Sequence, residues 1–242
     1  MESNKKSEIN APKSCRKRIL TDVIQIMKSP LTSNGIYYKH DENNLMKGYA
    51  MIIGQEDTPY ENGMYFFNFD FNINYPYKPP KLTYMTNGDN IRFNPNLYRT
   101  GKVCLSLLNT WRGEQWTSCQ TISSILLTLV SILHNKPLIN EPGINEFHYD
   151  FDKYNKIVRW GANKVAILYV MRGVKFEFFN ELFGNEISNH LKTNKTHIIE
   201  SLKELKKERK TTYKTALYCM TTEIDYKILF KEIKAEFKKL KI

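Results

Sequence analysis

The sequence lacks the features that mark membrane-spanning, secreted and disulfide-rich proteins. It contains no run of 18 or more apolar residues, which a transmembrane helix requires, and its polar first 13 residues lack the apolar stretch of a secretory signal. Its four cysteines, at positions 15, 104, 119 and 219, form no Cys-x-x-Cys pair. We therefore expect no membrane contact, no disulfide framework and no structural zinc site. A cytoplasmic or nuclear location fits this cysteine usage.

Histidines are few, and none has the spacing of a metal ligand. The five lie at positions 40, 134, 148, 190 and 197, so we predict no metal site. What is present is enough for a substantial core, since 41% of the 242 residues are hydrophobic. A chain of this length can hold one large domain, or one domain with an extension.

Negative charge is scarce at both ends of the chain, which has a net charge of +11. Residues 192–242 carry 14 Lys and Arg against 7 Asp and Glu, and residues 1–18 carry 6 against 2, while the middle is neutral. A nucleic-acid surface is one interpretation. Solvated helix faces are the other, and we favour it for the C-terminal part. We therefore do not expect nucleic-acid binding.

Hydrophobic patterning predicts a mixed α and β domain. Apolar residues at helical spacing, including Ile19, Val23, Ile26 and Met27, predict an N-terminal helix. Alternating aromatic and polar residues then predict strands, which we place at 46–54, 64–73 and 81–85. Together these segments indicate an antiparallel meander.

Helices are predicted for most of the remaining chain. A buried helix is expected at 122–134, a second helix at 152–172, and mostly helical structure over 173–242. The last helix is predicted to begin near Thr222, because Thr222 and Asp225 have the spacing of a capping box.

The chemistry is expected in the irregular segment 87–108, where Cys104 follows Asn96 by eight residues. A thiol can carry an acyl group as a thioester, and an amide N–H can donate a hydrogen bond to the oxyanion that forms when the thioester is attacked. The competing interpretation is that Cys104 is a buried strand residue, since free cysteine is often buried. These two residues alone leave both interpretations open.

The flanking motifs change that balance. Tyr-Pro-Tyr-Lys-Pro-Pro occupies 75–80, Gln-Thr-Ile-Ser-Ser occupies 120–124 and Asn-Glu-Pro-Gly occupies 140–143. With the spacing of Asn96 and Cys104, this order resembles the ubiquitin-conjugating enzymes, although Asn94 stands where that family usually has His. The Asn-Pro-Asn triplet, the Asn-Thr-Trp insertion and the Asn-Glu-Pro-Gly tail are similar to the large class called type Z.

The resemblance implies an α+β ubiquitin-conjugating fold. Such a fold has a four-stranded antiparallel meander packed with an N-terminal helix, a buried central helix and C-terminal helices. We accordingly predict a flexible basic tail at 1–13, a catalytic domain at 14–172 and a helical, basic C-terminal extension at 173–242.

The resemblance also implies an activity. Cys104 would accept ubiquitin or a ubiquitin-like modifier from an activating enzyme as a thioester, and pass it to a lysine of a protein substrate, usually with a ligase. Because ATP is used by the activating enzyme, we expect no cofactor here. Asn96 would either donate to the oxyanion or brace the loop. Glu141, beside Asn140, would position the incoming lysine, unless residues 140–143 are an ordinary turn.

Partner surfaces follow from the same resemblance. A ligase would contact Tyr77, Ser118 and Cys119, the alternative being that Tyr77 packs on neighbouring prolines. The activating enzyme would contact the basic residues of the first helix, unless these form only a solvated face; they are Arg16, Lys17 and Arg18.

Two tryptophans mark the insertion after Cys104. Trp111 and Trp116 are predicted to form a lid over the Cys104 groove, the alternative being that Trp111 packs on the core. Two other protein classes remain as alternatives to the enzyme: a module that binds ubiquitin or a ligase without being charged, and a nucleic-acid-associated protein. The presence of both Cys104 and Asn96 favours the enzyme.

Overall fold

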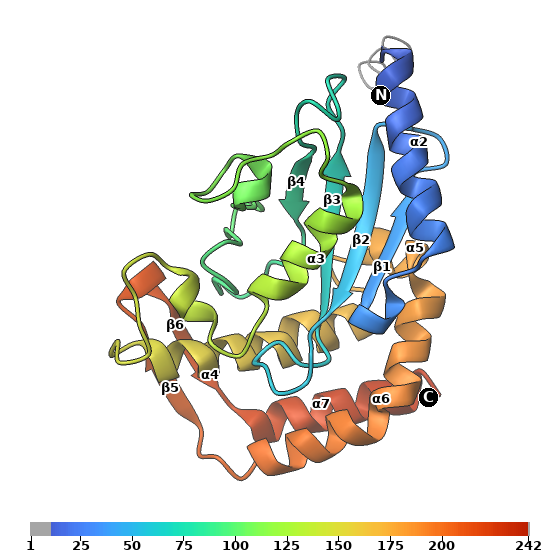
Figure 1. Ribbon diagram of the computed structural model, residues 1–242. Helices are drawn as coiled ribbons and strands as arrows, with labels where there is room; N and C mark the ends of the chain where they lie inside the picture. Colours follow the sequence, from blue (N-terminus) through green and yellow to red (C-terminus); the bar gives the residue numbers. More distant parts are fainter. Residues whose placement is uncertain (1–10, 242) are drawn as a thin grey trace. The chain divides into compact units, whose positions relative to one another are not determined.

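The computed structural model describes residues 11–241, and most of the predicted N-terminal tail lies outside them. Figure 1 shows the arrangement of the helices and strands. The described chain divides into two compact units. We call residues 11–52, 65–85 and 96–133 the sheet unit, and residues 53–64, 86–95 and 134–241 the helical unit. The predicted domain boundaries at 13 and 172 stay predictions.

The sheet unit is built on a four-stranded antiparallel sheet in the order β1-β2-β3-β4. The strands are β1 (Ile36–His40), β2 (Lys47–Ile53), β3 (Met64–Asp70) and β4 (Lys81–Tyr84). Ile36 pairs with Ile52, and Phe67 pairs with Tyr84. This meander confirms the predicted fold class.

Strand β3 forms the aromatic centre of the core. Tyr65, Phe67 and Phe69 are buried as their alternation predicts, but Phe66 is fully buried as well. Both faces of the first half of β3 are therefore covered, which a simple alternation of inward and outward residues does not anticipate. The predicted extension of the strand to Ile73 is wrong, because β3 ends at Asp70 and Ile73 is exposed.

Two helices pack with this sheet. Helix α2 (Lys13–Lys28) lies against α3 (Ile122–Ile132), and Figure 1 shows α3 crossing one face of the sheet. A capping box formed by Thr121 and Ser124 begins α3. Its inward residues are buried as predicted; they are Ile122, Ile125, Leu126 and Leu129. In α2 the prediction for Met27 is wrong, since Met27 is 74% exposed, whereas Asp22 is buried.

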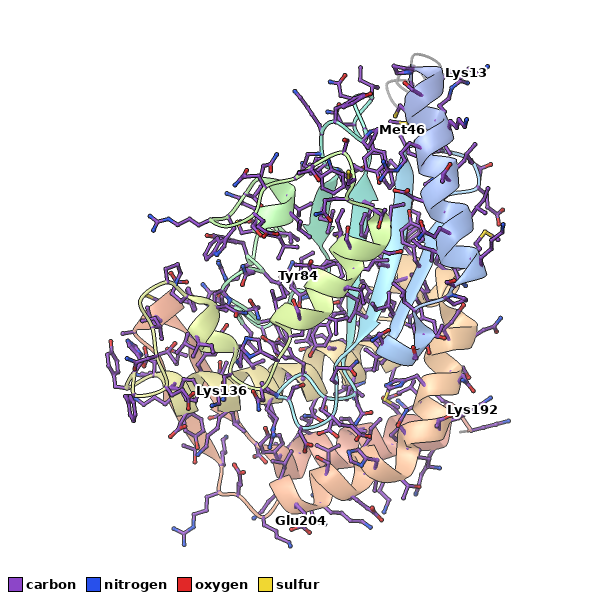
Figure 2. The ribbon with its side chains drawn as sticks, in the orientation of Figure 1. Lys13, Met46, Tyr84, Lys136, Lys192 and Glu204 are labelled. Carbon is purple, nitrogen blue, oxygen red and sulfur yellow. The ribbon has the colours of Figure 1, made fainter. Side chains whose placement is uncertain are left out.

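The helical unit contains the C-terminal half of the chain. Its helices are α4 (Phe151–Gly161), a π-helical continuation η4 (Ala162–Tyr169), α5 (Glu177–Leu182), α6 (Gly184–Leu205) and α7 (Tyr226–Lys239). Helix α6 packs along α7, and α7 packs against η4. Lys192 and Glu204 lie on the solvent-exposed side of α6 (Figure 2).

A hairpin interrupts the predicted helices of the C-terminal extension. Strands β5 (Thr211–Lys214) and β6 (Thr221–Ile224) pair antiparallel, with the short helical turn η5 (Leu217–Cys219) between them. The predicted capping box at Thr222 is wrong, because Thr222 lies in β6. Asp225 is instead the N-cap of α7, where its side chain accepts hydrogen bonds from the backbone N–H groups of Lys227 and Ile228.

The remaining short helical turns are η1 (Thr32–Asn34), η2 (Ser106–Leu108) and η3 (Pro137–Asn140). Within residues 11–241, no helix is both long enough and apolar enough to cross a bilayer.

An ion pair ties α7 to the end of the preceding helical segment, and it generates a prediction. Glu236 is 6% exposed and accepts from Arg172 at 3.0 Å and from Lys239 at 2.9 Å. Burial opposes ionisation, but these two hydrogen bonds outweigh it and lower the pKa of Glu236. Glu236→Gln is expected to lower the free energy of unfolding by about 1–2 kcal/mol at pH 7. Urea denaturation measures this.

The pH dependence follows from the lowered pKa. The contribution of the carboxylate is fully present above the unfolded-state pKa of about 4.3, and is lost as pH falls through the lower folded-state pKa. The difference between wild type and Glu236→Gln should therefore shrink below pH 4 or so. Glu232→Gln is the matched control, since Glu232 is 39% exposed and lies 3.6 Å from Arg172. An equal loss in both variants would contradict the assignment.

Candidate functional site

Asn96 and Cys104 form a reciprocal pair of hydrogen bonds in the sheet unit. The backbone N–H of Cys104 donates to the carbonyl oxygen of Asn96 at 2.8 Å, and the side-chain Nδ2 of Asn96 donates to the carbonyl oxygen of Cys104 at 2.7 Å. A β-bridge between Leu97 and Val103 lies just inside this pair. The eight-residue spacing therefore closes a short loop whose two ends are held side by side.

The loop-bracing role predicted for Asn96 matches this geometry. One amide N–H of Asn96 is engaged by the Cys104 carbonyl, and Asn96 itself is 5% exposed. The hydrogen bond fixes the backbone that carries the thiol. The oxyanion role stays a prediction.

Cys104 is covered in this conformation, with 2% of its surface exposed. A bulky modifier can reach the sulfur only if neighbouring groups move. The insertion after Cys104 supplies one such neighbour, because a Cβ built at Gly113 would lie 3.1 Å from the Cβ of Ser106, which is two residues beyond Cys104. The insertion thus passes close to the thiol-bearing loop.

The two tryptophans of the insertion have different environments. Trp111 is half-exposed. Trp116 is 7% exposed, its ring lies 5.8 Å from that of Tyr75, and its indole Nε1 donates to the carbonyl of Pro76 at 2.6 Å. Trp116 therefore anchors the end of the insertion, so that residues 109–115 are the part that can act as a lid.

The predicted ligase contacts lie on two loops of the sheet unit that are joined to each other. Tyr77 is 77% exposed and follows Pro76, whose carbonyl binds Trp116. Ser118 and Cys119 are exposed just beyond Trp116. The structure therefore brings the predicted ligase-binding residues onto connected loops.

Arg18 differs from its neighbours on α2. Its guanidinium pairs with Asp22 at 2.8 Å and donates to the carbonyls of Ser118 and Gln120 at 2.6 and 2.5 Å. Asp22 also accepts from the Tyr75 hydroxyl, and burial raises the pKa of Tyr75 well above its ordinary value. Arg18 thus holds the second loop in place, while Arg16 and Lys17 remain exposed.

A second group of polar residues lies in the helical unit. The amide of Asn94 donates to the Tyr60 hydroxyl at 2.8 Å, and Asn140 donates to Asn94 Oδ1 at 3.3 Å. The Tyr60 hydroxyl donates to the carbonyl of Phe93 at 2.7 Å, and burial raises the pKa of Tyr60, so that it stays neutral. Asn94 therefore forms the structural hydrogen bonds of this segment, and Asn140 belongs to the same network.

Glu141 is contacted by the C-terminal extension. The hydroxyl of Tyr218 donates to its Oε2 at 2.5 Å, and the guanidinium carbon of Arg92 lies 5.0 Å from the centre of the Tyr218 ring. The sequence gave no signal for Tyr60, Arg92 or Tyr218, because each meets its partner only through the tertiary fold. Among residues 11–241, no group of three or more His, Cys, Asp or Glu could hold a metal ion.

The fold and the Asn96–Cys104 loop define an acyl-transferring class of protein, and the sequence comparisons name it. The sequence model of the ubiquitin-conjugating enzymes matches residues 18–160. The chain belongs to the ubiquitin-conjugating enzyme family, a family of transferases.

Several relatives share the type Z likeness seen in the motifs, which confirms that prediction. Ubiquitin-conjugating enzyme E2 Z of Homo sapiens is 41% identical over 169 residues, covering 69% of this chain and 47% of that protein. The E2 Z of Xenopus tropicalis is 39% identical over 166 residues, covering 67% of this chain and 52% of that protein. Probable ubiquitin-conjugating enzyme protein 17 of Caenorhabditis elegans is 35% identical over 184 residues, covering 72% and 25%. The chain thus spans about half the length of the E2 Z relatives.

Replacing Asn96 tests the bracing role. Asn96→Ala removes the hydrogen bond to a buried carbonyl, and is expected to lower the free energy of unfolding by about 1–3 kcal/mol. Urea denaturation measures the loss, with the exposed Asn43 changed to Ala as the matched control. Unchanged stability together with slow transfer of the thioester would assign Asn96 to the oxyanion alone.

Proposed function

We propose that the chain is a working ubiquitin-conjugating enzyme that carries ubiquitin or a ubiquitin-like modifier on Cys104 and transfers it to lysine. The observation that carries the proposal is the hydrogen-bonded pair of Asn96 and Cys104, at the family spacing and inside the matched segment. A merely buried strand cysteine gives no reason for an amide to grip the backbone of the thiol-bearing residue.

The first step is a thioester exchange. The Cys104 sulfur attacks the modifier's carboxyl carbon on the activating enzyme, so that a new C–S bond forms while the activating enzyme's thiol leaves and takes up the proton. Thiolate is strongly nucleophilic even though only a few per cent of an ordinary thiol is ionised at pH 7. ATP is consumed before this step on the other enzyme, so we propose no nucleotide or other cofactor for this chain.

The second step forms an amide. The lysine amine attacks the thioester carbon, the C–S bond breaks, and the Cys104 thiolate leaves while the lysine nitrogen gives up a proton. A free lysine has a pKa near 10.4, so the amine must be oriented and deprotonated. We assign that orientation to Glu141, with Asn140 holding the adjacent turn. Oxyanion donors are typically worth about 3–4 kcal/mol, and Asn96 is the candidate.

The surfaces for partner proteins divide by what is exposed. Tyr77, Ser118 and Cys119 are the proposed ligase contacts, on loops held by Trp116 and Arg18. Arg16 and Lys17 are the exposed cations proposed for an acidic surface of the activating enzyme. Arg18 acts indirectly there, because its guanidinium is bound within the sheet unit. A reducing cytoplasmic or nuclear location would keep Cys104 available.

A charging assay tests the proposal. The chain is incubated with activating enzyme, ATP and ubiquitin, or a ubiquitin-like modifier with its own activating enzyme, and is analysed on a non-reducing gel. Wild type is expected to form an adduct that a reductant removes, and Cys104→Ala to form none, because the acyl-carrying sulfur is gone. Cys219→Ala is the matched control, since Cys219 is an exposed thiol.

Two results would contradict this function. A reducible adduct that persists in Cys104→Ala would place the thioester elsewhere. No adduct with any modifier would leave a binding module that has the fold without the transfer.

A further inference from the structure

We infer that Tyr218, on the turn of the β5–β6 hairpin, is a positioning residue that holds the Glu141 carboxylate for the incoming lysine. The inference rests on the proposed function, because that function is what assigns Glu141 to the lysine. It gives the C-terminal extension a direct part in the second step of the reaction.

The contact itself is specific. Tyr218 donates its hydroxyl hydrogen to Oε2 of Glu141 at 2.5 Å. Among residues 11–241, this is the one hydrogen bond made by the Glu141 carboxylate. Glu141 closes the short turn η3 and is half-buried, so its side-chain direction is set chiefly by the phenol. A carboxylate has two oxygens, and binding one of them leaves the other to accept from a lysine.

The ring of Tyr218 is itself held in place. The guanidinium carbon of Arg92 lies 5.0 Å from the centre of the ring, a cation–π distance, and the ring of Tyr154 lies at 5.9 Å. Arg92 is 8% exposed and fixed from the other side, because it donates to the carbonyls of Asn94 and Pro95 at 3.0 and 2.6 Å. The phenol is therefore clamped where it meets Glu141.

The turn that presents Tyr218 is held by a buried charge. Asp150 is fully buried, and its Oδ2 accepts from the backbone N–H groups of Ala216 and Leu217, each at 2.9 Å. Tyr218 and Cys219 have φ values of +62° and +47°, which side-chain-bearing residues seldom adopt. Such conformations persist where surrounding contacts impose them. The anchored hairpin thus holds the ring in a conformation that the local sequence would not choose.

A fixed carboxylate has a physical advantage over a mobile one. An ammonium that enters the site must be bound and turned so that, after losing its proton, its nitrogen faces the thioester. Pre-organised groups do this without paying for reorganisation at the moment of reaction. Loss of the phenol hydroxyl should weaken lysine binding without affecting how Cys104 is charged.

Tyr218→Phe tests the inference, because it removes the hydroxyl and keeps the ring. The charged protein is isolated from the activating enzyme, free lysine is added, and loss of the thioester is followed in a single turnover. We expect normal charging, and discharge to lysine about fivefold slower at low lysine concentration. The slowing should shrink as lysine approaches saturation. Discharge to hydroxylamine, which is uncharged at pH 7 and needs no carboxylate, should be unchanged.

Two comparisons make the result specific. In a Glu141→Gln background, Tyr218→Phe should add no further loss, since the two residues act as one unit. Tyr213→Phe is the matched control, because Tyr213 lies on the same hairpin and its hydroxyl contacts Lys156 at 3.3 Å. Its discharge rate should equal that of wild type.

Other outcomes would overturn the inference. Unchanged discharge to lysine would mean that Tyr218 does not position Glu141, and faster discharge would mean that it blocks the carboxylate. Equal slowing with hydroxylamine would indicate a general disturbance of the fold. A chain that never acquires a thioester overturns the proposed function as well, so the two failures are distinguishable.

Discussion

The hydrogen-bond pair between Asn96 and Cys104 is the constraint on which the proposed chemistry depends. Residues 96–121 are described throughout, and η2 is their one helical segment, so side chain-to-backbone bonds set much of the shape of this segment. Thr110 extends the pattern, because its hydroxyl accepts from the Leu105 N–H at 3.0 Å. A thiol held by such contacts keeps its position, but is also 2% exposed, so charging must coincide with movement of the cover rather than of the braced backbone.

That constraint also explains which parts of the site were predictable from sequence. Asn96 and Cys104 are close in the chain, so their relation is visible as a spacing. Glu141 and Tyr218 are 77 residues apart, and Asn94 meets Asn140 across 46 residues. No local pattern encodes such contacts, because they depend on the packing of whole elements. Arg18 shows the same limit, since its charge was visible but not its bond to the carbonyl of Ser118.

The fold divides in a similar way. Strand β3 and helix α3 were predictable because each buries one strong apolar pattern. The β5–β6 hairpin was not, because most of the residues in its two four-residue strands are exposed or half-exposed, and their threonines and lysines give no alternation of apolar and polar positions. Asp225 was identified as part of a helix start, but Thr222 was placed there too, since Thr and Asp both suit N-terminal caps.

The energetics of the hairpin favour reading the extension as part of the catalytic apparatus. Two side-chain-bearing residues with positive φ cost on the order of 1 kcal/mol or more each, and a short exposed hairpin has little stability of its own. The buried carboxylate of Asp150 offsets that cost by satisfying two backbone N–H groups of the turn. A linker or a solubilising tail would need no such conformation. The strain is explained if the turn exists to place one phenol against one carboxylate.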